Sequence, residues 1–155
     1  MNFKWSASGG NAPEALEFPF SVYTGSQRLE AAVQWVTGWD GQGARWRVWG
    51  GPNNGYWTET NPQGQPWNFR QELARDVWHS FSLTATILND QVFYQSFTVD
   101  GQTFPVQASY PGFADGTAAQ TVLAFQIDNN YWGNRQDVWL DALTLAATQS
   151  AGDQP

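Results

Sequence analysis

The chain has 155 residues, a formal net charge of −7 at pH 7 and no cysteine. A single domain of this length buries roughly 70% of the surface that its unfolded chain exposes, so it can fold without disulfides. Only seven residues are Lys or Arg, and because cations dominate binding to nucleic-acid phosphates, we expect no nucleic-acid partner. No apolar run approaches the roughly 20 residues of a membrane-spanning helix, so we expect no membrane insertion.

Three segments in the first third of the chain alternate apolar and polar residues as β-strands do: Leu16–Tyr23, Arg28–Trp39 and Ala44–Trp49. The first contains Pro19, which has no N–H to donate, so an edge position or a bulge is expected there. Residues 6–13 are rich in Gly, Ser and Asn and are expected to form a loop.

The third of these strands has two distinct faces. Alternation directs Trp46 and Val48 toward the core. It places three side chains on the opposite face: Arg45, Arg47 and Trp49.

The residues from Gly50 to Arg75 have the composition of long, aromatic-rich loops, with a possible helical turn near 69–74. Loops of this length in a compact domain are usually functional. They carry Tyr56, Trp57 and Trp67.

The stretch Val77–Val106 predicts three consecutive antiparallel strands: Trp78–Leu88, Val92–Val99 and Gln102–Val106. The second hairpin turns at Asp100-Gly101, where glycine accepts the positive φ of a type I′ turn. Such a meander indicates an all-β domain in which other strands must cover the apolar face.

Two further strands are expected near the C-terminus, Thr121–Asp128 and Asp137–Ala146, the second with a bulge near Asp141. The loop between them carries Tyr131 and Trp132. Together the strands predict one domain over residues 1–148, followed by a polar tail at 149–155. Its fold is expected to be a two-sheet antiparallel β-sandwich of jelly-roll type.

Several segments of the C-terminal half resemble the concanavalin A-like lectin/glucanase superfamily, which includes laminin-G-like modules, carbohydrate-binding modules, glucanases and polysaccharide lyases. The segments are Asp76–Phe81, Thr98–Gly101, Phe125–Asn129 and Asp137–Leu145. The resemblance covers about half the chain and implies a glycan or polysaccharide partner and an extracellular or cell-surface location, although the chain does not begin with a signal peptide. It also implies Asp141 as a ligand of a possible structural calcium ion; no other cofactor is expected.

Sugar rings stack their C–H faces on aromatic side chains, and their hydroxyls bond to amide, carboxylate and guanidinium groups. Trp39 and several other aromatic residues lie in loops or on polar faces, whereas Trp5, Trp35, Trp46 and Trp78 are expected in the core. The pair Arg45 and Arg47, with Gln126 and Asp128 on another strand, would suit a uronic acid. The predicted ligand-binding residues are Arg45, Arg47, Trp49, Tyr56, Trp57, Trp67, Gln126, Asp128, Tyr131 and Trp132.

Enzymatic alternatives have weaker sequence support. The closely spaced carboxylates of a retaining glucanase strand are missing from the sequence. The segments Arg70–Arg75 and Gln126–Asp128 resemble alginate-lyase motifs, but with an extra residue in the first and Asp128 in place of a histidine in the second. The only histidine, His79, is expected to be structural. The sequence therefore favours non-catalytic carbohydrate binding, with a lyase or glycoside hydrolase and a structural or assembly protein as alternatives; oligomeric state is left open.

Overall fold

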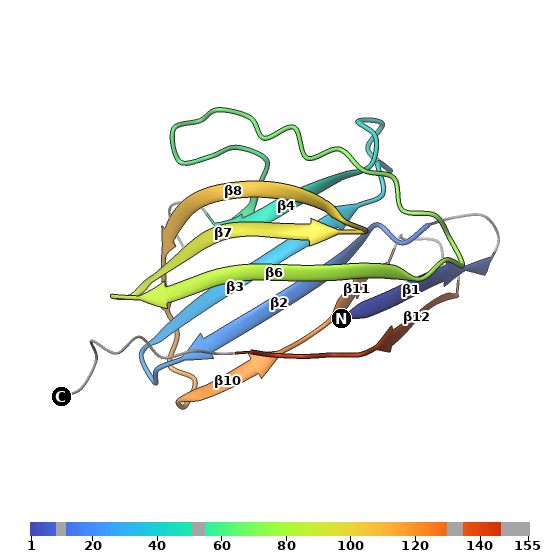
Figure 1. The fold of residues 1–155 in the computed structure, drawn as a ribbon. Helices are drawn as coiled ribbons and strands as arrows, with labels where there is room; N and C mark the ends of the chain where they lie inside the picture. The colour runs from blue at the N-terminus through green and yellow to red at the C-terminus, as the bar shows by residue number, and fades with distance from the viewer. Residues whose placement is uncertain (9–11, 51–54, 130–134, 147–155) are drawn as a thin grey trace.

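The structure, a computed structural model, describes residues 1–8, 12–50, 55–129 and 135–146. Its strands are β1 (Asn2–Ala7), β2 (Ala15–Tyr23), β3 (Gln27–Val36), β4 (Arg45–Gly50), β5 (Tyr56–Thr58), β6 (His79–Leu88), β7 (Gln91–Val99), β8 (Gln102–Pro111), β9 (Phe113–Ala114), β10 (Gln120–Leu123), β11 (Gln126–Asp128) and β12 (Gln136–Asp141). They form two antiparallel sheets packed face to face, which confirms the predicted β-sandwich (Figure 1). The jelly-roll connection pattern stays a prediction.

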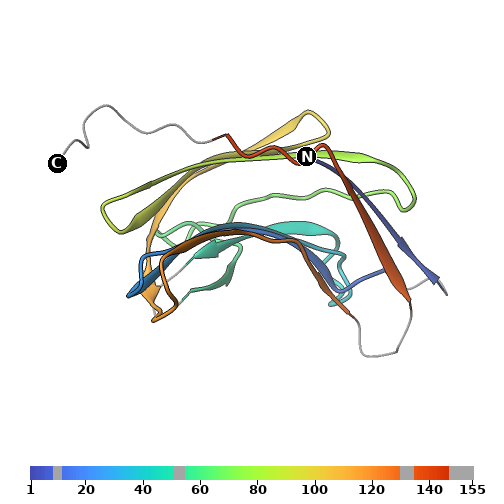
Figure 2. The same cartoon turned by 90° about the horizontal axis from the view of Figure 1, so that it is seen from below.

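The two sheets have different outward surfaces. One sheet has the order β12-β1-β6-β7-β8, and the other has the order β10-β2-β3-β4-β5, with β11 also pairing with β2 and β9 with β3. Figure 2 shows both layers arching in the same direction, so the backbone of the second sheet is concave on its outward side. We call the second sheet the concave sheet, its outward surface the concave face, and the first sheet the convex sheet.

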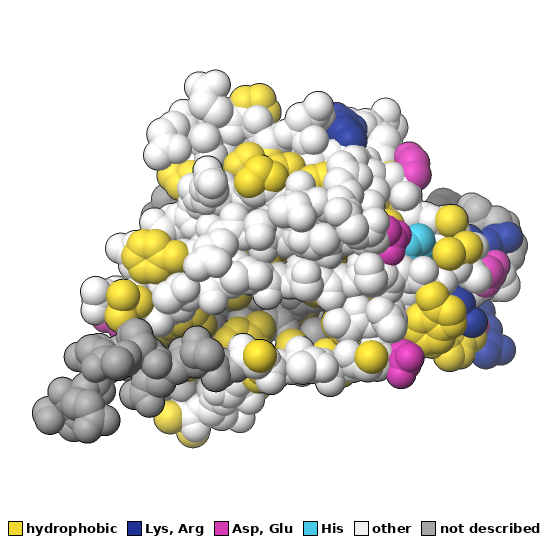
Figure 3. Space-filling view, viewed as in Figure 1, with side chains coloured by type: hydrophobic (Ala, Val, Ile, Leu, Met, Phe, Trp, Pro, Cys, Tyr) yellow, Lys and Arg dark blue, Asp and Glu magenta, His cyan; other side chains and the backbone are white. Residues whose placement is uncertain are grey.

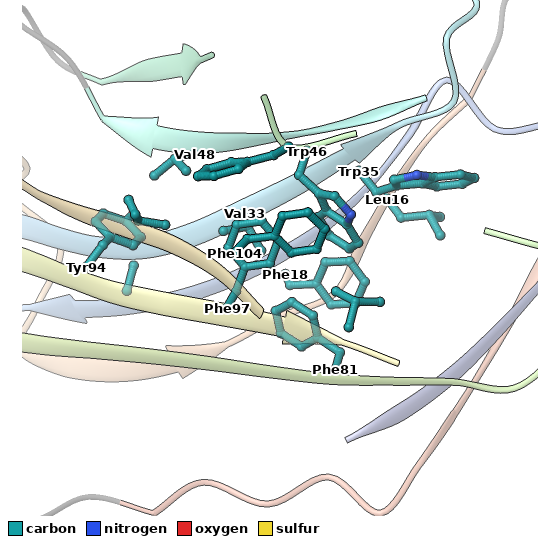
Figure 4. Close-up of a cluster of buried hydrophobic side chains, with 14 of the residues drawn as sticks. Leu16, Phe18, Val33, Trp35, Trp46, Val48, Phe81, Tyr94, Phe97 and Phe104 are labelled. Atoms are coloured by element: carbon teal, nitrogen blue, oxygen red, sulfur yellow. The ribbon is translucent and has the colours of Figure 1, made fainter. Parts of the chain in front are cut away.

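Aromatic side chains from both sheets meet in the core, as Figure 4 shows. Phe18 of the concave sheet stacks on Phe81 of the convex sheet with ring centroids 4.3 Å apart. Phe3 and Phe125 approach the ring of Phe18 edge-on, each with a centroid distance of 5.0 Å. Because aromatic pairs in such geometries add to the stabilisation from burial, this contact joins the two layers firmly.

The first strand was not expected from the sequence. β1 lies between β12 and β6 in the convex sheet and pairs with β12 over its whole length. Its alternation is short but regular, since Phe3, Trp5 and Ala7 are buried while Lys4 lies on the outward side. The expectation of a loop over residues 6–13 was therefore wrong at its beginning.

Pro19 explains why the expected strand Thr121–Asp128 is broken into β10 and β11. β2 is an interior strand with Pro19 in its middle, and its register with β3 has no shift, so neither the edge position nor the bulge expected at Pro19 is found. The carbonyl of Pro19 accepts a hydrogen bond from Ala124 N–H at 3.0 Å, so the side of Pro19 that lacks an N–H faces the same neighbour. The neighbouring strand is interrupted where the ladder has no donor.

Two other boundaries differ from the prediction. The last strand ends at Asp141, not at Ala146, because the backbone of Ala142 turns into the left-handed region with φ 51°. Trp78, expected in the core, is 49% exposed because it precedes β6 and lies outside the alternation of that strand.

The long segment after β5 is structural over much of its length. Phe69 and Leu73 are buried, and no helical turn forms between them. Gln71 accepts hydrogen bonds from the indole N–H groups of Trp35 (3.0 Å, to its backbone carbonyl) and Trp46 (2.9 Å, to its side chain). The segment therefore covers one side of the core, between the two layers in Figure 2.

The hydroxyl of Tyr94 connects the two sheets at the point where β3 and β4 separate. On β3, the residues that pair with β4 are Val33 to Val36. Ala32 therefore has no partner strand on its β4 side, although it lies opposite Pro19 of β2 on the other side. Tyr94, from β7, accepts a hydrogen bond from Ala32 N–H at 2.8 Å and can donate to the carbonyl of Trp49 at 2.8 Å. Burial raises the pKa of Tyr94, so its hydroxyl stays protonated.

We expect Tyr94→Phe to lower the free energy of unfolding by about 1–3 kcal/mol, because it leaves the buried N–H of Ala32 and the carbonyl of Trp49 unpaired. The measurement is chemical denaturation followed by tryptophan fluorescence. Tyr110→Phe is the matched control, since within the described residues the Tyr110 hydroxyl makes one long hydrogen bond, of 3.4 Å, to the Thr60 carbonyl. Equal losses in the two variants would contradict a specific role for the Tyr94 hydroxyl.

Candidate functional site

A row of polar side chains crosses four strands of the concave face. In the strand register, Gln126 lies opposite Glu17, Glu17 opposite Gln34, and Gln34 opposite Arg47. Residues that are directly opposite in neighbouring strands point to the same side of a sheet. We call these four residues the polar row.

A depression of about 130 Å³ adjoins the polar row. It is lined by Glu14, Ala15, Gln34, Val36, Trp39, Arg47 and Asp128. Trp39 is 62% exposed and projects from the turn between β3 and β4. That turn is closed tightly at Gly38, where φ is 82° and a Cβ would lie 2.6 Å from the carbonyl carbon of Gly43. The local backbone therefore requires glycine beside the exposed Trp39.

Gln34 joins two carboxyl groups at the centre of this site. Its Nε2 donates to Glu17 Oε1 at 2.7 Å and to Asp128 Oδ2 at 3.4 Å. The side chain is buried, and its Oε1 has no hydrogen-bond partner among the described residues. A buried carbonyl without a donor costs about 1–3 kcal/mol, so the site is short of one hydrogen-bond donor, although the oxygen itself is enclosed by protein atoms.

The carboxyl of Glu17 still holds its proton in about half of the molecules at neutral pH. Burial and then the charge of the adjacent Asp128 raise the pKa of Glu17 to about 7, although the hydrogen bond from Gln34 acts in the opposite direction. Glu17 and Asp128 also share a hydrogen bond. The pair therefore takes on its second negative charge only as the pH rises through about 7.

This raised pKa predicts a pH-dependent stability. Glu17 binds its proton more tightly in the folded chain than at the ordinary pKa of 4.5. The free energy of unfolding should thus fall as pH rises from 4.5 to about 7, by up to about 3 kcal/mol, and then level off. Glu17→Gln should remove this decline, measured by urea denaturation between pH 4 and 8. The exposed Glu72→Gln is the control, and an unchanged slope in Glu17→Gln would contradict the assignment.

The two arginines of β4 are already paired with carboxylates. Arg45 is only 2% exposed and bonds to Asp40 Oδ2 at 2.6 Å and to Glu59 Oε1 at 2.8 Å. Arg47 Nε also donates to Glu59 Oε1 at 2.8 Å, and its Nη2 lies 3.7 Å from Asp40 Oδ2. The expectation that both guanidinium groups face a ligand is therefore wrong for Arg45, because loop carboxylates and burial enclose it.

The electrostatics of this cluster are consistent with full ion pairing. The hydrogen bond from Arg45 is the main reason that the pKa of Asp40 falls to about 2. Burial alone would raise the pKa of Glu59, but hydrogen bonds from Arg45 and Arg47 lower it overall. Two cations and two anions balance, so the cluster offers little net positive charge to an anionic sugar.

Two tryptophans continue the concave face beyond the polar row. Trp49 follows Arg47 by two residues in β4 and lies opposite Trp57 of β5, with ring centroids 5.2 Å apart. Gly55 packs against the indole of Trp49 so closely that a Cβ would lie 2.7 Å from the ring. Trp49 and Trp57 are both partly exposed, so they can present ring surface beside the polar row.

Several predicted ligand-binding residues lie elsewhere. Strand alternation places Tyr56 on the face opposite Trp57, where it neighbours Tyr110, whose pKa is raised to about 12 by burial and by Tyr56. Trp67 packs against the core and stacks on Phe69 at 5.4 Å. Tyr56 and Trp67 therefore do not join the concave face, whereas Gln126 and Asp128 do. The predicted residues Tyr131 and Trp132 lie outside the described residues.

Asp141, the expected calcium ligand, accepts a hydrogen bond from the N–H of Ala142 at 2.8 Å at the end of β12. Within residues 1–8, 12–50, 55–129 and 135–146, no group of three or more His, Asp and Glu side chains is placed to hold a metal ion. A calcium ion at Asp141 stays a prediction.

His79 lies in the convex sheet, at the beginning of β6, and is buried. Its Nδ1 is 2.7 Å from Asp100 Oδ2, and its Nε2 donates to the carbonyl of Ala74 at 2.9 Å. Both ring nitrogens are thus engaged in contacts that fix the start of β6. This placement agrees with a structural role.

Glu17 and Gln34 were not predicted as site residues. Both alternate with buried apolar neighbours in their strands, and this pattern would have placed them on the face of Arg47 had the two strands been assigned to one sheet. Asp40 and Glu59 come from turns and irregular segments, where alternation carries no information about neighbours.

Comparison of the chain with protein-family models, curated proteins and solved structures gives no match. In the described part of the chain, no helix has the length and apolar character needed to cross a membrane.

Proposed function

We propose that this protein binds a glycan on the concave face without cleaving it, as an extracellular lectin-like domain. The observation that carries the proposal is the arrangement of the polar row between tryptophans. Trp39 lines the depression on one side of Arg47, and Trp49 follows Arg47 on the other side. A saccharide lying along this face would meet aromatic rings and planar polar groups in alternation.

The geometry of the carboxyl groups favours binding over hydrolysis. A retaining glycosidase holds its two carboxyl groups roughly 5 Å apart so that each can reach one side of the anomeric carbon. Glu17 and Asp128 instead share a hydrogen bond, with Gln34 bonded to both. A lyase would need a base near an unpaired cation, but Arg47 is paired with Glu59 and His79 belongs to the other sheet.

The first test is a glycan array at pH 7, with and without calcium, followed by calorimetry on any bound glycan. Trp39→Ala should weaken binding by roughly 1–3 kcal/mol, because an exposed aromatic anchor is lost. Trp139→Ala is the control, since Trp139 is equally large, 42% exposed and on the convex sheet. Equal affinity of Trp39→Ala and the unsubstituted chain would exclude Trp39 and the depression that it lines as the binding site, and release of shortened sugar products would establish an enzyme.

A second candidate function, that of a structural or assembly protein whose exposed aromatic residues make protein contacts, is favoured by one exposed cluster. Lys4 Nζ lies 4.4 Å from the ring of Trp139 and 5.4 Å from that of Trp78, and both tryptophans are more than 40% exposed. Figure 3 shows hydrophobic side chains beside basic ones at this end of the convex sheet, over β1 and β12. Exposed apolar surface of this kind often marks a contact with a partner.

If this cluster mediates self-association, sedimentation velocity should show a concentration-dependent oligomer that the double change Trp78→Ser and Trp139→Ser dissociates. Trp39→Ser, on the concave face, is the control and should leave the oligomer intact. A monomer at all concentrations would exclude self-association through this cluster.

A further inference from the structure

The donors and acceptors of the depression are unequal in number. The Nε2 of Gln34 is occupied by Glu17 and Asp128. With the amide in this orientation, Oε1 is the atom of Gln34 that has no partner among the described residues. Because this buried oxygen has no partner among the described residues, it favours a ligand that donates a hydrogen bond.

The charges around the depression also favour a ligand without a negative charge. Glu14 and Asp128 line it, and Glu17 adjoins Asp128. The cation that lines it, Arg47, is 2.8 Å from Glu59 and 3.7 Å from Asp40. A ligand carboxylate placed here would meet more negative than positive charge, and like-charge contacts are an effective means of rejecting a wrong ligand.

Arg47 can still donate one hydrogen bond to a ligand. Its side chain is 25% exposed, and its Nη2 is too far from Asp40, at 3.7 Å, for a good hydrogen bond. This nitrogen can donate to a neutral oxygen, such as a hydroxyl or ring oxygen, without needing a full negative charge in return.

The size of the depression limits what it can hold. About 130 Å³ is well below the roughly 300–1,000 Å³ of pockets that enclose a whole drug-sized ligand. One sugar ring, or one edge of it, is therefore the appropriate unit, with the exposed indole of Trp39 beside it. The rest of a glycan would lie across the open concave face.

We propose that the depression is a subsite for one neutral, hydroxyl-rich sugar ring and that it rejects uronates. Ring hydroxyls donate to the carboxylates of Glu14 and Asp128 that line the depression, Arg47 donates to a neighbouring sugar oxygen, and Trp39 contacts the C–H face. This inference rests on the glycan binding proposed above, and it replaces the uronic acid that the arginine pair suggested from the sequence.

The test uses the full chain and pairs of polymers that differ only in the carboxyl group. Polygalacturonate, alginate and hyaluronan are each compared with their carboxyl-reduced forms, in which a CH₂OH group replaces each uronate carboxylate. We expect at least one reduced form to bind about tenfold or more tightly than its parent by calorimetry. Equal or tighter binding of the uronate parents would overturn this inference but leave glycan binding in place. Binding of none of these polymers, nor of any neutral glycan on the array, would overturn both proposals.

A substitution tests whether the depression is the site that distinguishes uronate polymers from their reduced forms. Asp128→Asn keeps the shape of the side chain but removes its charge, so it should reduce the affinity ratio of reduced to parent polymer by about fivefold or more. Asp90→Asn, in the exposed turn between β6 and β7, is the matched control and should leave the ratio unchanged. An unchanged ratio in folded Asp128→Asn would show that the depression is not the discriminating site.

Discussion

The hydroxyl of Tyr94 is the contact on which the shape of the concave sheet depends. β3 and β4 part beyond Val33, and the backbone groups exposed there would be buried without partners if the convex sheet did not supply a hydroxyl. Buried backbone groups are almost always paired, so this opening exists only with a polar side chain in it. The same hydroxyl bonds to the carbonyl of Trp49 and so connects the packing of the two layers with an aromatic residue of the concave face.

The curvature of the concave sheet explains why polar groups of its outward face are buried. β3 is covered on both faces, since Val33 and Trp35 point into the core while Ala32 and Gln34 are also inaccessible. Polar side chains in such a position must satisfy one another, and Gln34 does so for two carboxyl groups. The exception is Gln34 Oε1, which has no hydrogen-bond partner among the described residues. The proposed glycan binding would therefore use polar groups that already hold the folded sheet together.

Much of this architecture could be predicted from alternation alone, because a strand's two faces follow directly from its sequence. The faces of Arg47, Trp49 and Asp128 were predicted in this way, as was the sandwich itself. Strand pairing was not predictable from the sequence. The position of Glu17 directly opposite Gln34 in the neighbouring strand was therefore missed. Short strands such as β1 carry too few residues for a periodic signal, and long-range partners in turns follow no period at all.

The arginine cluster shows why residue type is a poor guide to ligand charge. Two guanidinium groups on one strand face suggest an anion site, because arginine binds carboxylates in a bidentate manner. The protein supplies such carboxylates itself, from Asp40 in the β3–β4 turn and Glu59 after β5, and Arg45 is buried with them. What remains for a ligand is set by the groups left unpaired after folding. On this face they are mainly acceptors, which is the complement of a hydroxyl and not of a carboxylate.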